Sequence, residues 1–328
     1  MAPTPSTAIT PYCKCPRCNT MYRRRSYSSR ARKPIRSTGR RRSSRRAYRT
    51  KKRTYRKKGA MTKKRILNVT SRKKRDTMLT MSNTTSTGAS QSVAVAPAVV
   101  NAAQGAIFLW CATARDLTPG AGDLAKVTQD AMRTSSTCYM RGLSEHIRLQ
   151  TSSSLPWLHR RICFTYKGVQ PFRGRPAADS GTSSQYIETS NGMQRLWFNN
   201  QINQTPNYVN EISGVIFKGA FGVDWNDTIS APIDTKRITL KYDRTRTIAS
   251  GNERGVLREY KLWHGMNKNL VYDEDETGAS TDTTYWSVPS KAGMGDYYIM
   301  DIFQGGNGGQ TTDLLRLDST STLYWHEK

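Results

Sequence analysis

Runs of Lys and Arg with interspersed Tyr fill the first 75 residues of this 328-residue chain. Cationic side chains attract nucleic-acid phosphates by releasing counterions, and Tyr rings stack on unpaired bases, so the combination suits single strands without sequence preference. A merely solubilising tail would leave the like charges repelling one another with no polyanion to relieve them. We therefore predict nucleic-acid binding by Arg23, Arg24, Arg25, Arg40, Arg41, Arg42, Arg45, Arg46, Tyr48, Tyr55, Lys63, Lys64, Arg65, Arg72, Lys73, Lys74 and Arg75.

The middle of the same tract has a second interpretation. Short clusters of Lys and Arg resemble nuclear-import signals, which host nuclear-import receptors recognise. The two roles are compatible, since one tract can serve them at different times. The residues predicted to direct import are Lys51, Lys52, Arg53, Arg56, Lys57 and Lys58.

Three cysteines near the start, Cys13, Cys15 and Cys18, have a spacing typical of metal ligands. A closed zinc site needs four ligands, and no fourth lies near, because all four His are far downstream. Metal binding would require a long reach or a second chain. We interpret these residues as unliganded thiols and predict no metal or cofactor.

An acidic run, Asp273, Glu274, Asp275 and Glu276, offers carboxylate oxygens of the kind that Ca²⁺ prefers. It could bind a cation at a subunit contact. The spacing of an EF-hand is absent, however, and a solvated acidic loop explains the run equally simply. We interpret it as such a loop.

Signatures of common enzymes are missing. The sequence contains no G-x-x-x-x-G-K-[ST], G-x-S-x-G, H-E-x-x-H or G-x-G-x-x-G element, and the four His fall in separate contexts. We therefore expect no enzymatic activity.

The charge distribution divides the chain into parts. Residues 1–75 hold 28 of the 52 Lys+Arg and no acid, whereas the remaining 253 residues hold 24 basic and 24 acidic side chains and are neutral. All Trp and Phe lie after position 107, so only the second part can build a core. We predict a leader (1–20), a basic arm that is disordered alone (21–75) and one folded domain (76–328).

Period-two patterns dominate that domain and predict an all-β fold. Polar connections rich in Gly, Pro, Asn, Asp and Ser favour two packed antiparallel sheets, as in a sandwich or jelly roll, with short helices in loops at 121–133 and 205–212. Residues 81–92 read as a loop. The expected strands are 106–112, 143–149, 157–167, 196–199, 215–221, 237–247, 256–263, 285–288, 297–303 and 320–327.

Several segments resemble capsid proteins of genomoviruses, small viruses with circular single-stranded DNA genomes that are related to geminiviruses. The segments are KKRILNVTSRKKRDTM (63–78), FLWCATARDLT (108–118), FKGAFGVDWND (217–227), APIDTKRITLKYDRTRTIASGNERG (231–255), WHGMNKNLVYDEDETG (263–278) and LYWHEK (323–328). The resemblance runs from about residue 21 to residue 328. MYRRR (21–25) resembles the usual start of these proteins, so 1–20 reads as an upstream extension.

The resemblance implies one viral jelly roll that assembles, in about sixty copies, into a small icosahedral shell. It further implies that the basic arm points inward onto a single-stranded DNA genome, and that the protein resides in the virion and, during assembly, in the host cell nucleus. Related geminivirus coat proteins use their arms for both DNA binding and nuclear import.

Two other functions compete with this one. The first is a cellular nucleic-acid-binding protein with a basic tail, from which a capsid protein differs by forming closed shells. The second is a nuclease or replication protein. The missing phosphate-binding loop and the absence of a His-x-His metal pair count against that second alternative.

Overall fold

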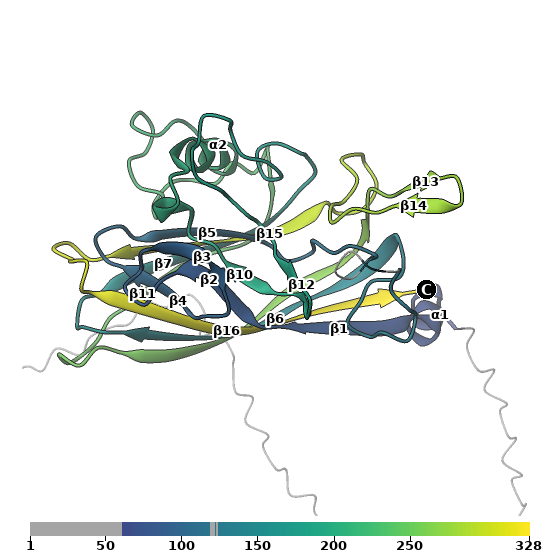
Figure 1. Cartoon of the computed structure of the whole chain (residues 1–328), viewed down its shortest axis with the longest axis horizontal. Coiled ribbons are helices and arrows are strands. Elements are labelled where there is room, and N and C mark those ends of the chain that lie inside the picture. Colours follow the sequence, from purple (N-terminus) through teal and green to yellow (C-terminus); the bar gives the residue numbers. More distant parts are fainter. Residues whose placement is uncertain (1–60, 119–121, 123) are drawn as a thin grey trace, which may run out of the picture. The chain divides into compact units, whose positions relative to one another are not determined.

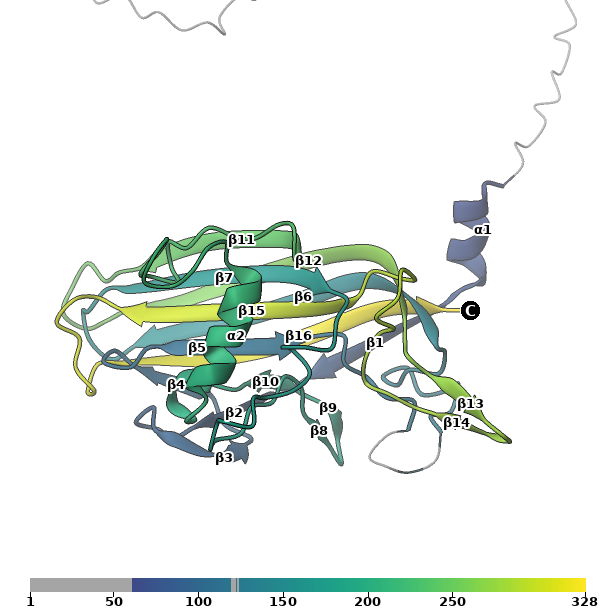
Figure 2. The same cartoon turned by 90° about the horizontal axis from the view of Figure 1, so that it is seen from above.

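Two antiparallel sheets make up most of the body (Figures 1 and 2). The computed structural model describes residues 61–118, 122 and 124–328. The first sheet has the strand order β1 (Arg72–Met78), β16 (Leu314–Glu327), β6 (Thr137–Thr151) and β12 (Leu257–Val271), and β4 (Ala98–Asn101) also pairs with β16. The second sheet has the order β11 (Thr239–Ile248), β7 (Trp157–Tyr166), β15 (Asp296–Gly305) and β5 (Ala106–Cys111).

Shorter elements complete the fold. The helices are α1 (Lys63–Thr70), α2 (Pro206–Ile216) and the 3-10 turn η2 (Asn200–Ile202). A three-stranded sheet has the order β10 (Arg195–Trp197), β2 (Thr80–Thr84) and β3 (Ser90–Ala94), with β10 parallel to β2. Two hairpins pair β8 (Glu188–Thr189) with β9 (Gly192–Met193), and β13 (Asp275–Thr277) with β14 (Ser280–Asp282).

The first sheet has one apolar and one polar side because its strands alternate. In β16, every second residue from Leu315 to Glu327 is buried, while the residues between them are partly or fully exposed. Successive side chains of a strand point to opposite faces, so this pattern places one row against the second sheet and the other row in solvent.

The strands β7, β15 and β5 of the second sheet are buried on both sides, whereas the edge strand β11 is mostly exposed. In β7 every residue from His159 to Thr165 is buried. α2 lies across this sheet (Figures 1 and 2), and its Tyr208, Ile212 and Ile216, spaced by four residues, share one core cluster with Phe164 of β7. The outward side of the first sheet has no such cover among the described elements, so it is the large exposed face of the body.

Buried ions connect the two sheets. Arg161 of β7 binds Asp301 of β15 through two bonds, Nε to Oδ1 at 2.7 Å and Nη2 to Oδ2 at 2.8 Å, and its Nη1 also pairs with Glu145 of β6. Arg195 of β10 pairs with Glu145 at 3.0 Å and with Asp301 at 3.2 Å. All four side chains are at most 1% exposed. Two cations and two anions thus compensate one another in the interior. A buried ion is tolerated only when a partner of opposite charge compensates it in this way.

Two histidines border this network. His159 lies 2.8 Å from Asp301, and His264 of β12 lies 3.4 Å from Arg161. Burial, followed by the charge of Arg161, lowers the pKa of His264 to about 4, and burial also lowers the pKa of His159. Both imidazoles are therefore neutral at pH 7 in the folded protein.

We predict that the folded body loses stability as the pH falls from 7 to 5. The unfolded chain binds protons on these histidines below their ordinary pKa of 6.5, whereas the folded chain resists protonation down to about pH 4 at His264. The expected loss in the free energy of unfolding is about 2 kcal/mol for His264 over this range. Denaturant midpoints measured at each pH test it.

The control for this experiment is a pair of variants. His264→Gln should flatten the pH dependence, whereas His146→Gln, which changes an exposed histidine, should leave it unchanged. An equal slope for the wild type and His264→Gln would contradict the prediction.

Most of the expected strands are present, and the mostly β, antiparallel character is confirmed. The strand expected at 215–221 is wrong, because Val215 and Ile216 end α2. The strand expected at 285–288 is reduced to a single bridge between Tyr272 and Ser287. Residues 81–92 were expected as a loop but carry most of β2 and the start of β3, joined by a turn in which Gly88 has φ 80°.

Of the two expected helices, the one at 205–212 is confirmed as α2. The one at 121–133 is wrong within its described residues, which form turns in which the Gln129 side chain accepts a hydrogen bond from Lys126 N at 2.6 Å.

The expected start of the folded domain at residue 76 also needs correction. Residues 63–70 form α1, and β1 begins at Arg72, so the last part of the predicted disordered arm is ordered. The physical reason is pairing, since every residue of β1 lies opposite a residue of β16. The leader and residues 21–60 of the arm lie outside the described residues.

Candidate nucleic-acid interface

The described end of the basic arm runs directly into the first sheet. Lys63, Lys64 and Arg65 lie in α1, whose N-terminal cap is Thr62. Arg72 and Lys73 open β1, and both are exposed. The Arg72 guanidinium donates a hydrogen bond to the carbonyl of Val127. β1 is an edge strand, so the arm reaches the body at the border of the exposed sheet face.

Lys74 differs from the other predicted nucleic-acid-binding residues of β1. It is 2% exposed, and its Nζ pairs with Glu327 at 3.0 Å and donates to the carbonyl of Met132 at 2.7 Å. Its position in β1 places it on the side that faces the core. Glu327 thus compensates the charge of Lys74 inside the protein, and we no longer expect Lys74 to contact phosphates.

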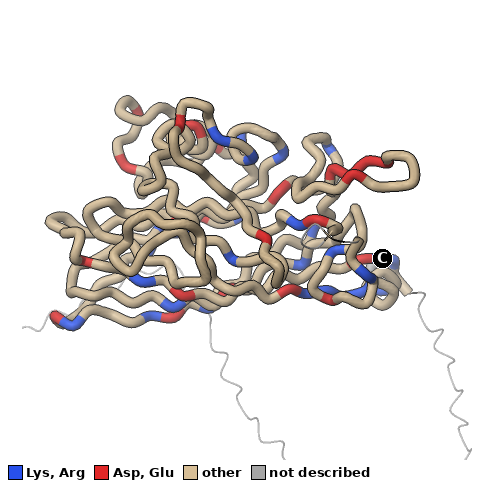
Figure 3. The backbone as a smooth tube through the Cα atoms, in the orientation of Figure 1, with Lys and Arg blue, Asp and Glu red and all other residues tan. Residues whose placement is uncertain are grey.

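Six cations lie on the outer face of the first sheet, by which we mean the side chains of β1, β16, β6 and β12 that point away from the second sheet. The strand register and the alternation of burial place them there. Figure 3 shows Lys and Arg in the strands of this sheet. They are Lys73 and Arg75 of β1, Arg141 and Arg148 of β6, Lys261 of β12 and Arg316 of β16.

The two acids of this face lie beside particular basic residues. Asp318 pairs with Arg148 at 2.8 Å and with Arg316 at 3.1 Å. Glu259 lies 3.2 Å from His146. The other four cations, Lys73, Arg75, Arg141 and Lys261, form no ion pair within the described part of the chain, and we call them the basic patch.

Two observations show that Lys73 and Arg141 lie close together near the end of the arm, whereas Lys261 lies on β12, opposite His146. Lys73 lies opposite His326, which in turn lies opposite Tyr139 of β6. Partial burial lowers the pKa of His326, and the charges of Arg141 and Lys73 lower it further. Arg141 is oriented by Asn267, whose Oδ1 accepts a hydrogen bond from its guanidinium.

The remaining predicted site residues cannot be placed, because they lie outside the described residues. They are Arg23, Arg24, Arg25, Arg40, Arg41, Arg42, Arg45, Arg46, Tyr48, Tyr55, the import residues Lys51, Lys52, Arg53, Arg56, Lys57 and Lys58, and the thiols Cys13, Cys15 and Cys18.

Sequence reasoning missed Arg141 and Lys261. Both are isolated cations in strands, so no run or motif marks them. The alternation around 143–149 and 256–263 indicates the strands, but only the pairing of β6 with β12 and β16 shows that these two cations share one face and lack acidic partners.

The acidic run at 273–276 is only partly a solvated loop. Asp275 and Glu276 lie in the exposed hairpin β13–β14, which carries acidic residues in Figure 3. Glu274 instead forms an ion pair with buried Arg133, whose guanidinium also lies 3.6 Å from the centroid of the Tyr272 ring. The described residues contain no group of three or more His, Cys, Asp or Glu that could hold a metal ion.

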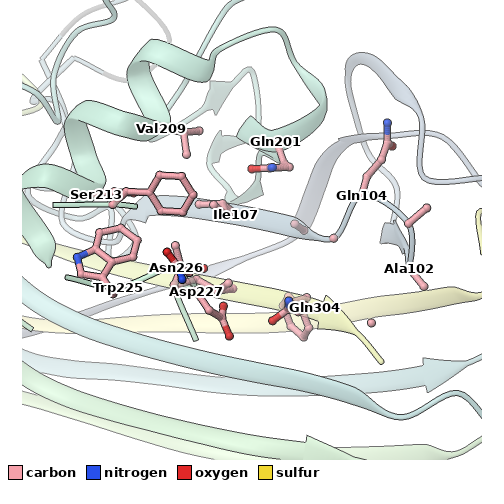
Figure 4. Close-up of a pocket in the computed structure, with 18 of the residues that line it drawn as sticks. Ala102, Gln104, Ile107, Gln201, Val209, Ser213, Trp225, Asn226, Asp227 and Gln304 are labelled. Carbon is pink, nitrogen blue, oxygen red and sulfur yellow. The ribbon is translucent and has the colours of Figure 1, made fainter. Parts of the chain in front are cut away.

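A large cavity, about 1050 Å³, lies between α2 and the ends of β5 and β15 (Figure 4). Its lining is mainly Gly, Ala and amide side chains around Trp225. Asp227 is the one ionisable residue of the lining, and its carboxylate accepts a hydrogen bond from Ile229 N at 2.9 Å. The cavity presents no nucleophile with a base beside it, so we do not assign it chemistry.

Cys163 and His264 form a thiol–imidazole contact of the kind found in cysteine-dependent enzymes. The Cys163 sulfur lies 3.7 Å from His264 Nδ1. Burial raises the pKa of the Cys163 thiol, and both residues lie between the sheets. A catalytic cysteine needs a lowered pKa and an accessible thiolate, so this pair has the opposite properties.

Two comparisons with known proteins gave no match that could be set beside this interface. No protein-family model matches the chain, and no characterised protein matches its sequence. No helix among residues 61–118 and 124–328 is long and apolar enough to span a membrane.

We predict that replacing Lys73, Arg75, Arg141 and Lys261 together by Gln in the full chain weakens binding to single-stranded DNA. Each lost phosphate contact should reduce the slope of log affinity against log salt by about 0.7. Fluorescence anisotropy over a salt series measures the slope.

The matched control replaces Arg148 and Arg316 by Gln. Both are exposed cations of the same face, but they share the carboxylate of Asp318, so their loss should change the slope less. A larger effect from this control than from the patch variant would contradict the assignment.

Proposed function

We propose that this protein is a capsid protein that packages single-stranded DNA inside a closed shell of its own copies. The observation that carries the proposal is the charge division of the chain. A tract of 28 cations without any acid leads into β1, and the sheet that begins there carries an unpaired basic patch. A polycation attached to a neutral β-rich body is what packaging of a polyanion requires.

The strand order supports a single jelly roll as the fold of the body. The eight long strands follow the chain order β1, β5, β6, β7, β11, β12, β15 and β16. The first sheet takes β1, β16, β6 and β12 from this series, and the second takes β11, β7, β15 and β5. The chain thus changes sheet at every connection except β7 to β11. Such alternation between two four-stranded sheets is what two Greek keys in a jelly roll require.

The orientation of the subunit follows from the charges. The basic patch and the end of the arm lie on the same sheet, so the outer face of that sheet would line the interior and meet the DNA. α2 and the loops around it cover the opposite sheet and would lie away from the genome.

The arm charge sets the scale of the genome. About sixty subunits, the number implied by the resemblance to genomovirus capsid proteins, would bring roughly 1,700 positive charges, and single-stranded DNA carries one negative charge per nucleotide. Small cations can neutralise a modest excess of phosphate. A packaged strand on the order of two kilobases would follow.

A cellular nucleic-acid-binding protein with a basic tail shares the charge division but would not form closed shells. A nuclease or replication protein would need a site for phosphodiester chemistry, and the described residues bring no such constellation together. Both alternatives predict particles to be absent.

Electron microscopy and sedimentation of the purified full chain test the proposal. We expect closed particles of uniform size that protect single-stranded DNA from nuclease. Halving the arm charge by Arg-to-Gln and Lys-to-Gln changes should lower the encapsidated length or give emptier shells. A protein that stays monomeric under all conditions would overturn the proposal, and a DNA content independent of arm charge would overturn the role of the arm.

Import into the nucleus forms part of the same proposal. Replacing Lys51, Lys52, Arg53, Arg56, Lys57 and Lys58 together by Ala in a large fluorescent fusion should reduce its nuclear accumulation, because import receptors read clustered basic residues. Microscopy of transfected cells measures the nuclear fraction. Unchanged accumulation would place the signal elsewhere in the chain.

A further inference from the structure

An exposed aromatic pair lies within the basic patch. Trp263, on the outer face of β12, is 55% exposed. The centroid of its ring lies 5.8 Å from that of Tyr324 on β16, with an angle of 55° between the ring planes. Strand β6 runs between β12 and β16, so the indole must extend across a whole strand to reach Tyr324.

A glycine makes this reach possible. Gly142 of β6 lies opposite both Tyr324 and Gly265. A Cβ atom at position 142 would come within 2.8 Å of Trp263 Cζ2, which is closer than real contacts allow. The indole therefore lies over bare backbone, and the two rings form a continuous aromatic surface across three strands.

A second aromatic pair lies in the neighbouring row of the same face. Tyr139 of β6 and His326 of β16 are register partners, and their ring centroids are 6.0 Å apart. The lowered pKa of His326 keeps its ring uncharged at neutral pH. Lys73 and Arg75 border the two pairs on the β1 side.

Packing alone accounts poorly for this arrangement. Cross-strand aromatic pairs do stabilise sheets, but the other tryptophans of the two main sheets, Trp110, Trp157 and Trp325, are 1% exposed or less. Trp263 keeps more than half of its surface in solvent, Lys261 precedes it on the same face of β12, and Arg75 lies opposite its partner Tyr324. Rings beside free cations are the composition of sites that hold single strands, where bases stack and phosphates pair with the cations.

We propose that Trp263 and Tyr324, extended by Tyr139 and His326, form a stacking platform for the unpaired bases of single-stranded DNA. The basic patch holds the phosphates on either side. The proposal rests on the proposed packaging function and adds that the folded body, not only the arm, selects single strands. A duplex keeps its bases paired and stacked inside, so it cannot use the platform.

The test compares full-length protein variants at a salt concentration that weakens the phosphate contacts. The probes are an oligodeoxythymidylate, an abasic oligomer with the same backbone, and a duplex. The wild type should prefer the oligodeoxythymidylate to the abasic strand. Trp263→Ala with Tyr324→Ala should reduce that preference on the order of ten-fold, with binding of the abasic strand unchanged. Trp263→Phe should retain part of the preference.

The matched control is Phe221→Ala. Phe221 is also an exposed aromatic residue, 65% exposed, but it lines the cavity beside α2. Its loss should change none of the three affinities. Ultraviolet crosslinking followed by peptide mapping should also find Trp263 or Tyr324 attached to the thymidine strand.

The outcomes separate the two proposals. A wild type that prefers the thymidine strand, with the same preference in the Trp263 and Tyr324 double variant, would overturn the platform and leave packaging intact. A wild type that neither binds single-stranded DNA nor forms particles would overturn the proposed function itself.

Discussion

The buried ion network between the two sheets is the constraint on which the rest of the structure depends. Glu145 of β6 and Arg161 of β7 join the sheets, and Arg195 and Asp301 complete the neutral group. The Arg195 guanidinium also lies between the rings of Trp110 and Trp197, at 4.3 and 3.9 Å from their centroids. Such a group tolerates no shift in register, because any slip would leave a charge buried without its partner. The network fixes the register of β6 through the inner residue Glu145. It therefore also fixes the positions of Tyr139, Arg141 and Gly142 on the outer side of the same strand.

The distribution of acids on the outer face is as important as that of cations. Asp318 and Glu259 could in principle have neutralised any of the basic residues there. The register assigns them to Arg148, Arg316 and His146, at the part of the face remote from the end of the arm. The half next to β1 is left without acids. The face is thus positive where β1, which carries the end of the basic tract, joins the sheet.

Local patterns predicted the strands whose inner residues are apolar and failed where the interior is polar. β7 and β15 read as strands because their period-two or continuous apolar sequence is long. The first four residues of β1 (RKKRDTM) fall in the predicted disordered arm because no pattern marks them as a strand. One of the two buried residues of β1 is Lys74, and the partner that makes this burial possible, Glu327, is more than 250 positions away in the sequence. α2 was cut short by a strand prediction since Val215 and Ile216 are β-branched, but spacing by four from Tyr208 decided the outcome.

The candidate site, too, could be predicted from the sequence only in part. The sequence indicates how much positive charge the chain carries and which tract concentrates it. It does not show that Lys74 is neutralised or that Arg141 and Lys261 are free, because both facts depend on strands that lie far apart along the chain. The role of Gly142 likewise could not be predicted from the sequence, since the indole that lies over it belongs to Trp263, far along the chain.

The place of β16 in the first sheet constrains how the chain is made. β16 lies between β1 and β6, so β1 has no partner in this sheet, and β6 pairs only with β12, until residues 314–327 have been synthesised. Pairings over such sequence separation are slow to form. While the ribosome is still translating, β1 and its lysines remain unpaired. The exit of the last strand then completes the sheet and buries Lys74 in one late step.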